Sequence, residues 1–518
     1  MERKPSLAHR LIPSVGDLFF ITVLCSLYFT AKSSLLSDGD TGYHIRAGEL
    51  ILATGAVPRF DSFSLHSPPI PWIAHEWLSE VLMAATHRML GMSGIVAGSA
   101  LLLALTGYLL FWSLRNSNAG VLLASAVTLL ALASSQLHWL ARPHLFSLLL
   151  LVIFHHLIES WHRERGNDLY LLPPLMLLWA NLHGGFMAGF ILLGAYLAGN
   201  MASLALAPDP ERGALRRKLT QLSIATGACL AAALINPYGY RLLLFPFRLA
   251  TETYLMNNVS EFLTPDFHDQ LPFKYLLLLA VGVLALWRKG PEPTELMLML
   301  GFGYMALYAV RYIPLFALVS APIIARGVTE IAQRGGTAAR VLRERSERLS
   351  RIDERAGGFW PWAAAFAVAV SLIYGRPSHA FDAAEKPVAA CEFLMRQKIS
   401  GNMFNSDEFG DYLIYRGFPS YRVFIDGRLD MYGSDRLREY NQVIRFENGW
   451  ESVLEKYRVT WILFETDSRL TRFLLKEKDW ALIYADPVAT IFVKKAPGNE
   501  RLRVQYQALQ LKGGQATF

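Results

Sequence analysis

Repeated apolar stretches, each close to the length of a membrane span, constrain this chain more than any other feature. A helix needs roughly 20 mostly apolar residues to cross the hydrocarbon core. Of the 518 residues, 53% are hydrophobic and 18% are charged, which is too apolar for an ordinary soluble enzyme. We therefore expect an all-α multi-pass membrane domain over residues 1–375, with about eleven spanning helices at residues 15–36, 93–113, 119–137, 144–158, 169–182, 185–206, 219–235, 273–287, 295–310, 313–326 and 359–375.

Basic residues gather in alternate connections between these predicted helices. They occupy the N-terminus, four short loops and the run from Arg334 to Arg355. With eleven spans, all six groups lie on one side, and Lys and Arg mark the cytoplasmic side. We expect an inner-membrane protein whose N-terminus is cytoplasmic, whose first apolar stretch is a retained anchor and whose C-terminal region is periplasmic. Helix orientation accounts for the net charge of +7, so we expect membrane lipid and no nucleic acid as a partner.

The composition changes after Tyr374. Short β-rich runs at residues 421–427, 459–465 and 489–495 alternate with helical patterns, which is typical of a small α/β domain. We expect this extracytoplasmic domain over residues 376–495. Residues 496–518 show no clear period and are expected to form a flexible tail.

The most specific segment lies in the first predicted external loop, residues 37–77. It contains two acids, Asp38 and Asp40, separated by a glycine and followed by a run with helical spacing. Asp40 is therefore expected near a helix N-terminus, where the helix dipole stabilises its ionised form. A carboxylate there can accept a proton from a hydroxyl or hold a divalent ion. The alternative is that Asp40 or Thr41 only caps the helix, which leaves Asp38 unexplained.

Isolated cationic residues lie at the external ends of other apolar runs. Arg142 stands directly before a proline and Arg311 stands three residues before one, and a guanidinium can bind a phosphate through two hydrogen bonds. Snorkelling toward lipid head groups is the alternative. His183 lies in a short helical turn, where it could contact a ligand or simply end a helix.

Two further patterns have a chemical interpretation. The Asp426-Gly-Arg428 sequence follows a predicted strand and fits either an internal turn with an ion pair or an acceptor-binding element. His75-Glu76 does not begin a zinc-protease motif, because residues 79 and 80 are Ser and Glu.

The first-loop residues resemble those of the GT-C glycosyltransferases, multispanning enzymes that use polyprenyl-phosphate sugar donors. The matching run is Asp38-Gly-Asp40, an amphipathic helix and then Gly55-Ala-Val-Pro58-Arg-Phe-Asp61. It is most similar to the catalytic subunit of oligosaccharyltransferase, whose Asp-Pro-Tyr-Tyr-His-Leu-Arg segment is matched at its His and Arg by His44 and Arg46. Glu261 matches a glutamate of a later external loop. The run from Asp407 to Tyr412 is a loose echo of the acceptor-contacting Trp-Trp-Asp-Tyr-Gly motif.

This resemblance implies transfer of a sugar or glycan from a polyprenyl-phosphate-linked donor to a glycan or protein acceptor outside the cytoplasm. Asp40 would be the catalytic base or anchor a divalent cation, Mg²⁺ or Mn²⁺, with Asp38 and Glu261 as further ligands. The donor phosphate would meet Arg142, Arg311, His183 and His44, and the acceptor would meet Asp407, Asp426 and Arg428. The chain departs from the family in the loop Gln136 to Pro143, which lacks the family's acidic pair.

Two other classes of protein compete with this interpretation. A transporter or flippase for lipid-linked glycans would carry charged residues at mid-span and paired broken helices, whereas the polar groups here gather at one face. A non-enzymatic membrane scaffold would leave the Asp38 and Asp40 pair without a role.

The topology is testable with reporter fusions. A reporter fused after Phe518 should be active outside the cytoplasm, and one fused near Arg345 should be active inside, because eleven spans put these points on opposite sides. Activity of both fusions on the same side would contradict the number of spans.

Overall fold

The computed structural model describes residues 11–517, except residues 31–32, 270, 357, 508 and 513–514. The chain separates into two compact units. Unit 1 comprises Met1–Ala31, Ser93–Leu244 and Asn258–Ser378, and unit 2 comprises Lys32–Met92, Phe245–Asn257 and His379–Phe518. The first predicted external loop and the C-terminal region thus belong to one unit, although most of the helical part of the chain separates them in sequence.

Unit 1 is helical, and each of the eleven predicted spans overlaps a helix. These helices are α2 Val15–Tyr28, α4 Trp77–Asn116, α5 Val121–Ser135, α6 His144–His162, α7 Leu172–Leu182, α8 Met187–Leu206, α9 Asp209–Ala233, α12 Pro272–Leu286, α13 Pro293–Tyr308, α14 Ile313–Gln333 and α16 Trp360–Ile373. Residues 77–92 of α4 belong to unit 2. Among the described residues, five helical stretches are long and apolar enough to cross a membrane, and four shorter apolar helices accompany them. The multi-pass membrane character is supported, and the number of eleven spans stays a prediction.

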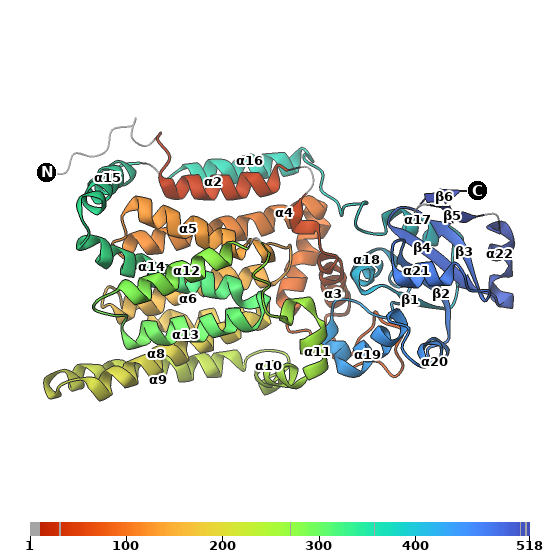
Figure 1. The fold of residues 1–518 in the computed structure, drawn as a ribbon, viewed down its shortest axis with the longest axis horizontal. Helices are drawn as coiled ribbons and strands as arrows, with labels where there is room; N and C mark the ends of the chain where they lie inside the picture. The colour runs from red at the N-terminus through yellow and green to blue at the C-terminus, as the bar shows by residue number, and fades with distance from the viewer. Residues whose placement is uncertain are drawn as a thin grey trace. The chain divides into compact units, whose positions relative to one another are not determined.

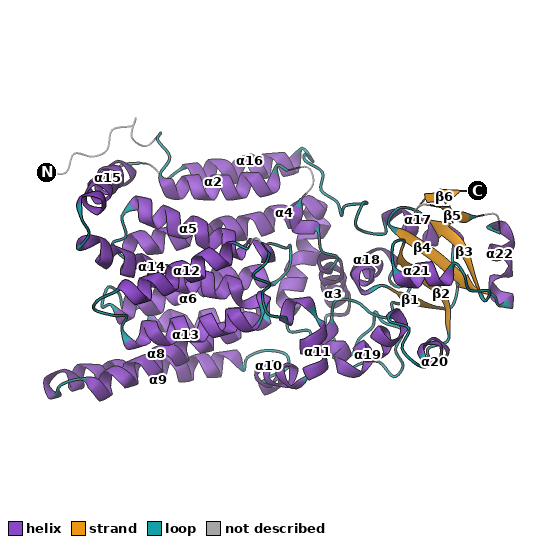
Figure 2. Ribbon diagram, viewed as in Figure 1, coloured by secondary structure: helices purple, strands orange, loops and turns teal. Residues whose placement is uncertain are grey.

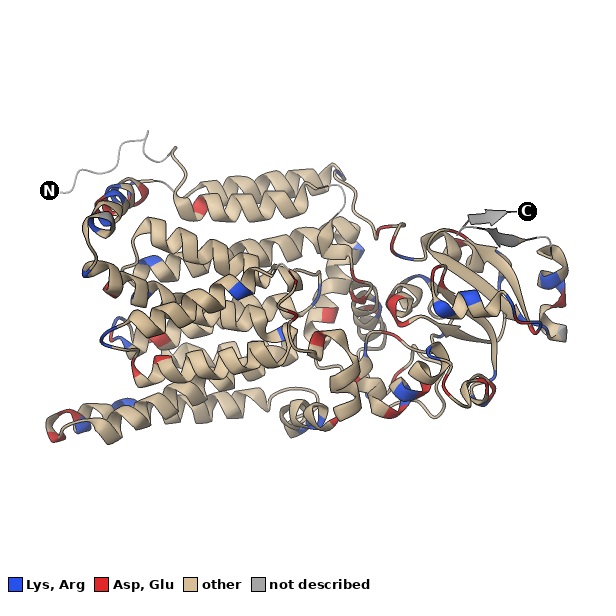
Figure 3. Ribbon diagram, viewed as in Figure 1, with Lys and Arg blue, Asp and Glu red and all other residues tan. Residues whose placement is uncertain are grey.

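The helices of unit 1 pack through apolar side chains. α14 packs against α5 and α12, α13 packs against α8, and α2 lies beside α16 (Figure 1). Charged residues are sparse along these helices and dense on α15, Thr337–Asp353 (Figure 3). On α15, Leu342, Leu349 and Ile352 are exposed beside the arginines, which is the pattern of a helix lying at a membrane surface.

The C-terminal part of unit 2 contains a four-stranded mixed sheet (Figure 2). The strand order is β1-β2-β4-β3, with β1 Asn402–Asn405 parallel to β2 Val459–Glu465, and with β4 Ala489–Lys494 antiparallel to β2 and to β3 Trp480–Ala485. The sheet is accompanied by α17 Val388–Gln397, α18 Asp407–Gly417, α19 Leu429–Ile444, α20 Trp450–Lys456 and α21 Arg469–Leu474, and later by α22 Glu500–Gln505, β5 Gln510–Lys512 and β6 Gln515–Thr517. The small α/β region predicted after Tyr374 is therefore present.

One predicted strand is wrong. Residues 421–427 do not join the sheet, because the backbone of Val423 is bonded to the first loop instead. The N–H of Val423 donates to the carbonyl oxygen of Phe63, and its carbonyl oxygen accepts from the N–H of Leu65. This pairing forms an isolated parallel bridge between Ser64 and Val423, and it fixes the segment that leads to Asp426.

Helix α3, Asp40–Thr54, follows the two acids of the first loop and packs closely on its neighbours through glycines. A Cβ added at Gly42 would lie 2.7 Å from Cβ of Tyr415 in α18, and one added at Gly48 would lie 1.9 Å from the carbonyl oxygen of Glu80 in α4. The helix ends at Gly55, whose φ of 66° is the left-handed conformation that glycine adopts without strain. α3 is thus held backbone to backbone between α18 and the start of α4.

Replacing Gly48 should therefore destabilise the protein. In Gly48→Ala the new methyl group would overlap the backbone of α4, and such overpacking costs about 1–3 kcal/mol or more. We expect a lower temperature of thermal unfolding in detergent. Gly213→Ala is the matched control, since Gly213 is helical and has open space around its Cβ position, so that alanine's higher helix propensity should leave stability unchanged or slightly higher. An unchanged unfolding temperature for Gly48→Ala would contradict the close packing.

Candidate active site

Two carboxyl groups that are distant in sequence meet at the start of α3. Asp40 is the first residue of α3, and Asp411 lies buried in α18. Their side chains are hydrogen bonded to each other. A Cβ added at Gly427 would lie 2.4 Å from Oδ1 of Asp40 and 2.9 Å from Oδ2 of Asp411. Both carboxyl groups therefore converge on a stretch of backbone where only glycine leaves room for them.

The surroundings of Asp411 favour its protonated form. Burial and the neighbouring carboxylate of Asp426 raise the pKa of Asp411 to about 7, although hydrogen bonds from Asp40 and from the Gly427 N–H act in the other direction. The Gly427 N–H lies 3.2 Å from Oδ1 and 3.1 Å from Oδ2 of Asp411. The Asp40–Asp411 pair thus holds a proton close to neutral pH, where a group that exchanges protons with a substrate works best.

Asp38 has a different contact. Its Oδ1 accepts a hydrogen bond of 3.0 Å from the backbone N–H of Asp40. This contact satisfies one of the donors at the first turn of α3, as a capping side chain does. Of the two acids in the motif, Asp38 therefore binds the helix backbone, whereas the carboxyl group of Asp40 lies beside Asp411.

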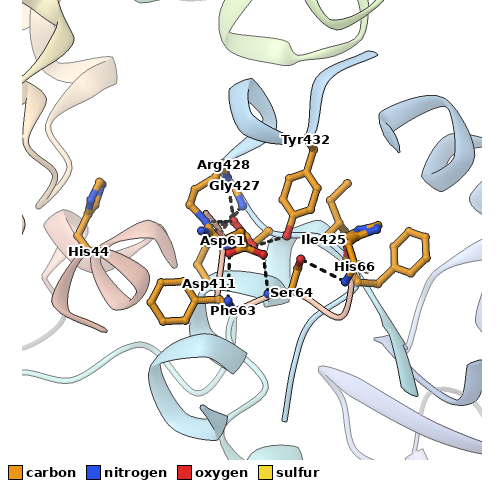
Figure 4. A network of polar contacts seen from close by, with 12 residues as sticks. His44, Asp61, Phe63, Ser64, His66, Asp411, Ile425, Gly427, Arg428 and Tyr432 are labelled. Carbon is orange, nitrogen blue, oxygen red and sulfur yellow. Dashed lines mark hydrogen bonds and ion pairs between the residues drawn. The ribbon is translucent and has the colours of Figure 1, made fainter. Parts of the chain in front are cut away.

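A buried arginine holds the loop around Gly427 (Figure 4). Arg428 is 2% exposed and donates to both oxygens of Asp426, at 2.7 Å each, and to Oδ1 of Asp61 at 2.8 Å. The hydroxyl of Tyr432 donates to Oδ2 of Asp426 at 2.6 Å. Asp426 and Arg428 thus form an internal ion pair, which is one of the two roles expected from the sequence, and they fix Gly427 between them.

Asp61 ties the first loop to this ion pair. Its oxygens also accept from the backbone N–H groups of Phe63 and Ser64, at 3.0 and 2.9 Å. Burial acts to raise the pKa of Asp61, but the Arg428 charge and these hydrogen bonds outweigh it, so the pKa is lowered. Asp61 is therefore ionised in the folded protein, which matches the charge of Arg428.

His44 lies on α3, one turn after Asp40, and is almost fully buried. Burial lowers its pKa to about 4, against the opposing effect of Glu76. A neutral imidazole carries no positive charge to attract a phosphate. Its neighbour in the motif, Arg46, donates to the carbonyl oxygen of Tyr415 at 2.7 Å and pairs with Glu49.

Asp407, at the start of α18, contacts α19. Its Oδ1 accepts from the Tyr440 hydroxyl at 2.9 Å, and its N–H donates to the same hydroxyl at 3.1 Å. The run from Asp407 to Tyr412 also contains Asp411, for which the sequence predicted no role. Its position inside the run that resembles the acceptor-contacting motif was the one signal that could have identified it.

In unit 1, two of the residues expected to bind the donor phosphate, Arg142 and Arg311, lie around Glu261. Nη1 of Arg142 lies 3.0 Å from Oε1 of Glu261, and the Arg311 guanidinium lies 4.7 Å from the centre of the Phe262 ring. Burial acts to raise the pKa of Glu261, but Arg142 and Arg311 outweigh it and lower the pKa to about 2. The structure thus brings these two arginines together around one carboxylate, in the segments η5 Ser260–Phe262 and η6 Val310–Tyr312 and the loop before α6.

Histidines accompany this group. The His144 ring lies 5.8 Å from that of His138 and 6.4 Å from that of His183, centre to centre. Nδ1 of His183 lies 2.7 Å from Oγ of Ser147 and accepts from the N–H of Gly185 at 2.9 Å. His183 therefore ends one helical turn and begins the next, and it lies in the same unit as the arginines.

Comparisons with known proteins found similar solved structures but no similar sequence family. No family model and no curated protein matches the chain. Solved structures of the oligosaccharyltransferase from Archaeoglobus fulgidus do match it. The apo form is 13% identical, with a TM-score of 0.54 over 93% of this chain and 74% of that one. The enzyme AglB in complex with an inhibitory peptide and a dolichol-phosphate is 11% identical, with a TM-score of 0.54 over 91% and 72%.

A third structure of that oligosaccharyltransferase, in complex with Zn and sulfate, is 13% identical, with a TM-score of 0.50 over 93% and 72%. The resemblance to the GT-C glycosyltransferases expected from the first loop is therefore confirmed in the fold. At these identities the likeness concerns the fold alone.

The raised pKa of Asp411 predicts a pH dependence of stability. Because its pKa is about 7 in the fold and 3.8 as the ordinary value, the folded state binds more protons between these two values. The contribution of Asp411 to stability is therefore present at low pH and is lost as the pH rises toward 7. The Asp411→Asn side chain does not titrate and can still accept the hydrogen bond from the Gly427 N–H. The unfolding temperature of this variant, relative to that of the native protein, should therefore rise by a few degrees as the pH is raised from 5 to 8.

Asp435→Asn is the control, since the Asp435 side chain is 92% exposed and its replacement should give no such pH-dependent gain. Parallel pH profiles for Asp411→Asn and the native protein would show that Asp411 titrates normally.

Proposed function

We propose that this chain is a membrane glycosyltransferase that transfers a sugar or glycan from a polyprenyl-phosphate-linked donor to a glycan or protein acceptor on the extracytoplasmic side. The observation that carries the proposal is the hydrogen-bonded pair of Asp40 and the buried Asp411 on a GT-C-like fold. Support comes from the archaeal oligosaccharyltransferase of similar fold, whose structure holds a dolichol-phosphate and an inhibitory peptide.

The chemistry needs a base at the acceptor. A bond forms between the acceptor atom and the anomeric carbon, the bond from that carbon to the phosphate oxygen breaks, and the acceptor proton moves to a carboxylate. Asp40 takes this proton in its ionised form, which its place at the positive end of α3 favours. Asp411 shares a hydrogen bond with it and holds it in position. Asp38 is a positioning residue, which fixes the backbone of Asp40.

The departing lipid phosphate needs positive charge. In unit 1, Arg142 and Arg311 supply it, and the ion pair with Glu261 orients Arg142. Fixed cationic donors stabilise charge that develops in the transition state without a cost of reorganisation. His183 accompanies them as a neutral hydrogen-bonding group. In unit 2, Asp407 would bind the acceptor. Asp426 and Arg428 are positioning residues, because their ion pair fixes Gly427, which contacts Asp40 and Asp411.

A divalent cation, Mg²⁺ or Mn²⁺, at Asp38, Asp40 and Glu261 stays a prediction. Asp38 and Asp40 lie in unit 2, and Glu261 lies in unit 1, where it pairs with Arg142. Oδ1 of Asp38 is bonded to the backbone N–H of Asp40. These contacts do not favour that ligand set, and no step above depends on it.

The proposal is tested by incubating the purified protein with a pool of lipid-linked sugars and measuring released polyprenyl phosphate. Asp40→Asn keeps the volume and removes the charge, so the protein should fold while release falls by about 100-fold or more, roughly the contribution of a positioned base. Glu49→Gln is the control on the same helix, because the Glu49 side chain is 38% exposed and contacts Arg46, and it should leave the rate unchanged.

Two outcomes would overturn the assignment. Full activity of Asp40→Asn would favour a capping role for the acids. Absence of released polyprenyl phosphate across donors and acceptors, with lipid-linked glycan crossing the bilayer, would instead identify a flippase.

A further inference from the structure

A second group of ionisable side chains in unit 2 has no part in the proposed transfer reaction. It consists of His44 on α3, Glu76 just before α4 and Glu80 in the first turn of α4. Nδ1 of His44 lies 3.3 Å from Oε1 of Glu80 and 3.7 Å from Oε2 of Glu76. One ligand atom from each residue lies within 4.8 Å of the other two. In Figure 4, His44 lies apart from the Arg428 network.

The group is buried to a degree that charged residues rarely reach without compensation. His44 is 2% exposed and Glu80 is 1% exposed, and the Glu76 side chain is 12% exposed. Among the described residues, Oε2 of Glu80 is buried and has no hydrogen-bond partner. A buried carboxylate oxygen without a partner is costly, and a cation between the two carboxylates and the imidazole would offset that cost.

The distances suit a metal ion. Zinc binds imidazole nitrogen and carboxylate oxygen at about 2.0–2.2 Å, which puts neighbouring tetrahedral ligand atoms about 3.3–3.6 Å apart. The two His44 distances are close to this range. A donor set of one imidazole and two carboxylates, with no thiolate, suits Zn²⁺ and, with lower affinity, Mn²⁺.

We propose that His44, Glu76 and Glu80 bind a divalent transition-metal ion, with zinc as the preferred metal. The ion joins α3 to the start of α4 at the place where Gly48 lets the two backbones touch. His75, whose Nε2 lies 3.8 Å from Oε1 of Glu76, is placed to orient that carboxylate, as outer partners of metal ligands do. The site fixes the helix that carries Asp40, and it does not depend on the chain being a glycosyltransferase.

The metal is tested on the full-length protein in detergent, stripped with a chelator and then dialysed against Zn²⁺. We expect close to one tightly held Zn²⁺ per chain by elemental analysis and a higher unfolding temperature with Zn²⁺, because a ligand that binds the folded state stabilises it. Glu80→Gln keeps the shape of the side chain and should weaken binding by roughly 10- to 100-fold or more, the range seen when even an outer partner is lost. Glu49→Gln on α3 should bind Zn²⁺ as the native protein does.

Two more variants keep the test decisive. His44→Cys, loaded with Co²⁺, should gain the charge-transfer absorption of a cobalt–thiolate bond, which identifies residue 44 as a ligand even if Glu80→Gln does not fold. Asp40→Asn should keep its Zn²⁺. The proposal is overturned if the native protein binds no Zn²⁺ or Co²⁺, if Glu80→Gln binds Zn²⁺ with native affinity, or if the ion is lost from Asp40→Asn instead. None of these readouts uses glycosyl transfer, so failure of the metal site and failure of the proposed activity can be told apart.

Discussion

The position of the candidate catalytic acids in unit 2 depends on one buried guanidinium. Arg428 is held by Asp426 from its own turn and by Asp61 from the first loop, and it lies 4.8 Å from the centre of the Trp72 ring and 5.0 Å from that of Phe63. Breaking a buried ion pair by removing one partner costs about 3–5 kcal/mol, because a charge is left uncompensated. Asp61, Asp426 and Arg428 thus hold together two segments that lie at opposite ends of the sequence.

Close backbone contacts, together with the Arg428 ion pairs, hold the segments of this site against one another. Glycines at positions 42, 48 and 427 remove the side chains that would separate α3 from α18, from α4 and from the turn before α19. As a consequence, the carboxyl groups of Asp40 and Asp411 share a hydrogen bond, and His44 faces Glu80. Helix α3 therefore carries one member of the Asp40–Asp411 pair at its first residue and a candidate metal ligand, His44, one turn later.

Features with a local cause could be predicted from the sequence. Hydropathy located a helix at each predicted span, alternation identified β2 and β4, and the Asp38-Gly-Asp40 motif marked the start of α3 and the resemblance to the GT-C fold. The error at residues 421–427 came from tertiary context, because those backbone groups pair with the first loop rather than with the sheet. Asp411 and Glu80 were missed because their neighbours in the folded protein are far from them in sequence.

The sequence by itself determined the apolar spans, the small α/β region and the chemical types of the first-loop motif, since these depend on residues that are near one another along the chain. Only the tertiary structure decided which acid has which role. Asp38 bonds to the backbone of Asp40, Asp40 meets Asp411, and Arg428 is saturated by Asp426 and Asp61. The physical reason is that desolvation and electrostatic pairing depend on distances in space. The same carboxylate group therefore bonds to a helix N-terminus, meets a second carboxyl group or pairs with a buried arginine according to its neighbours.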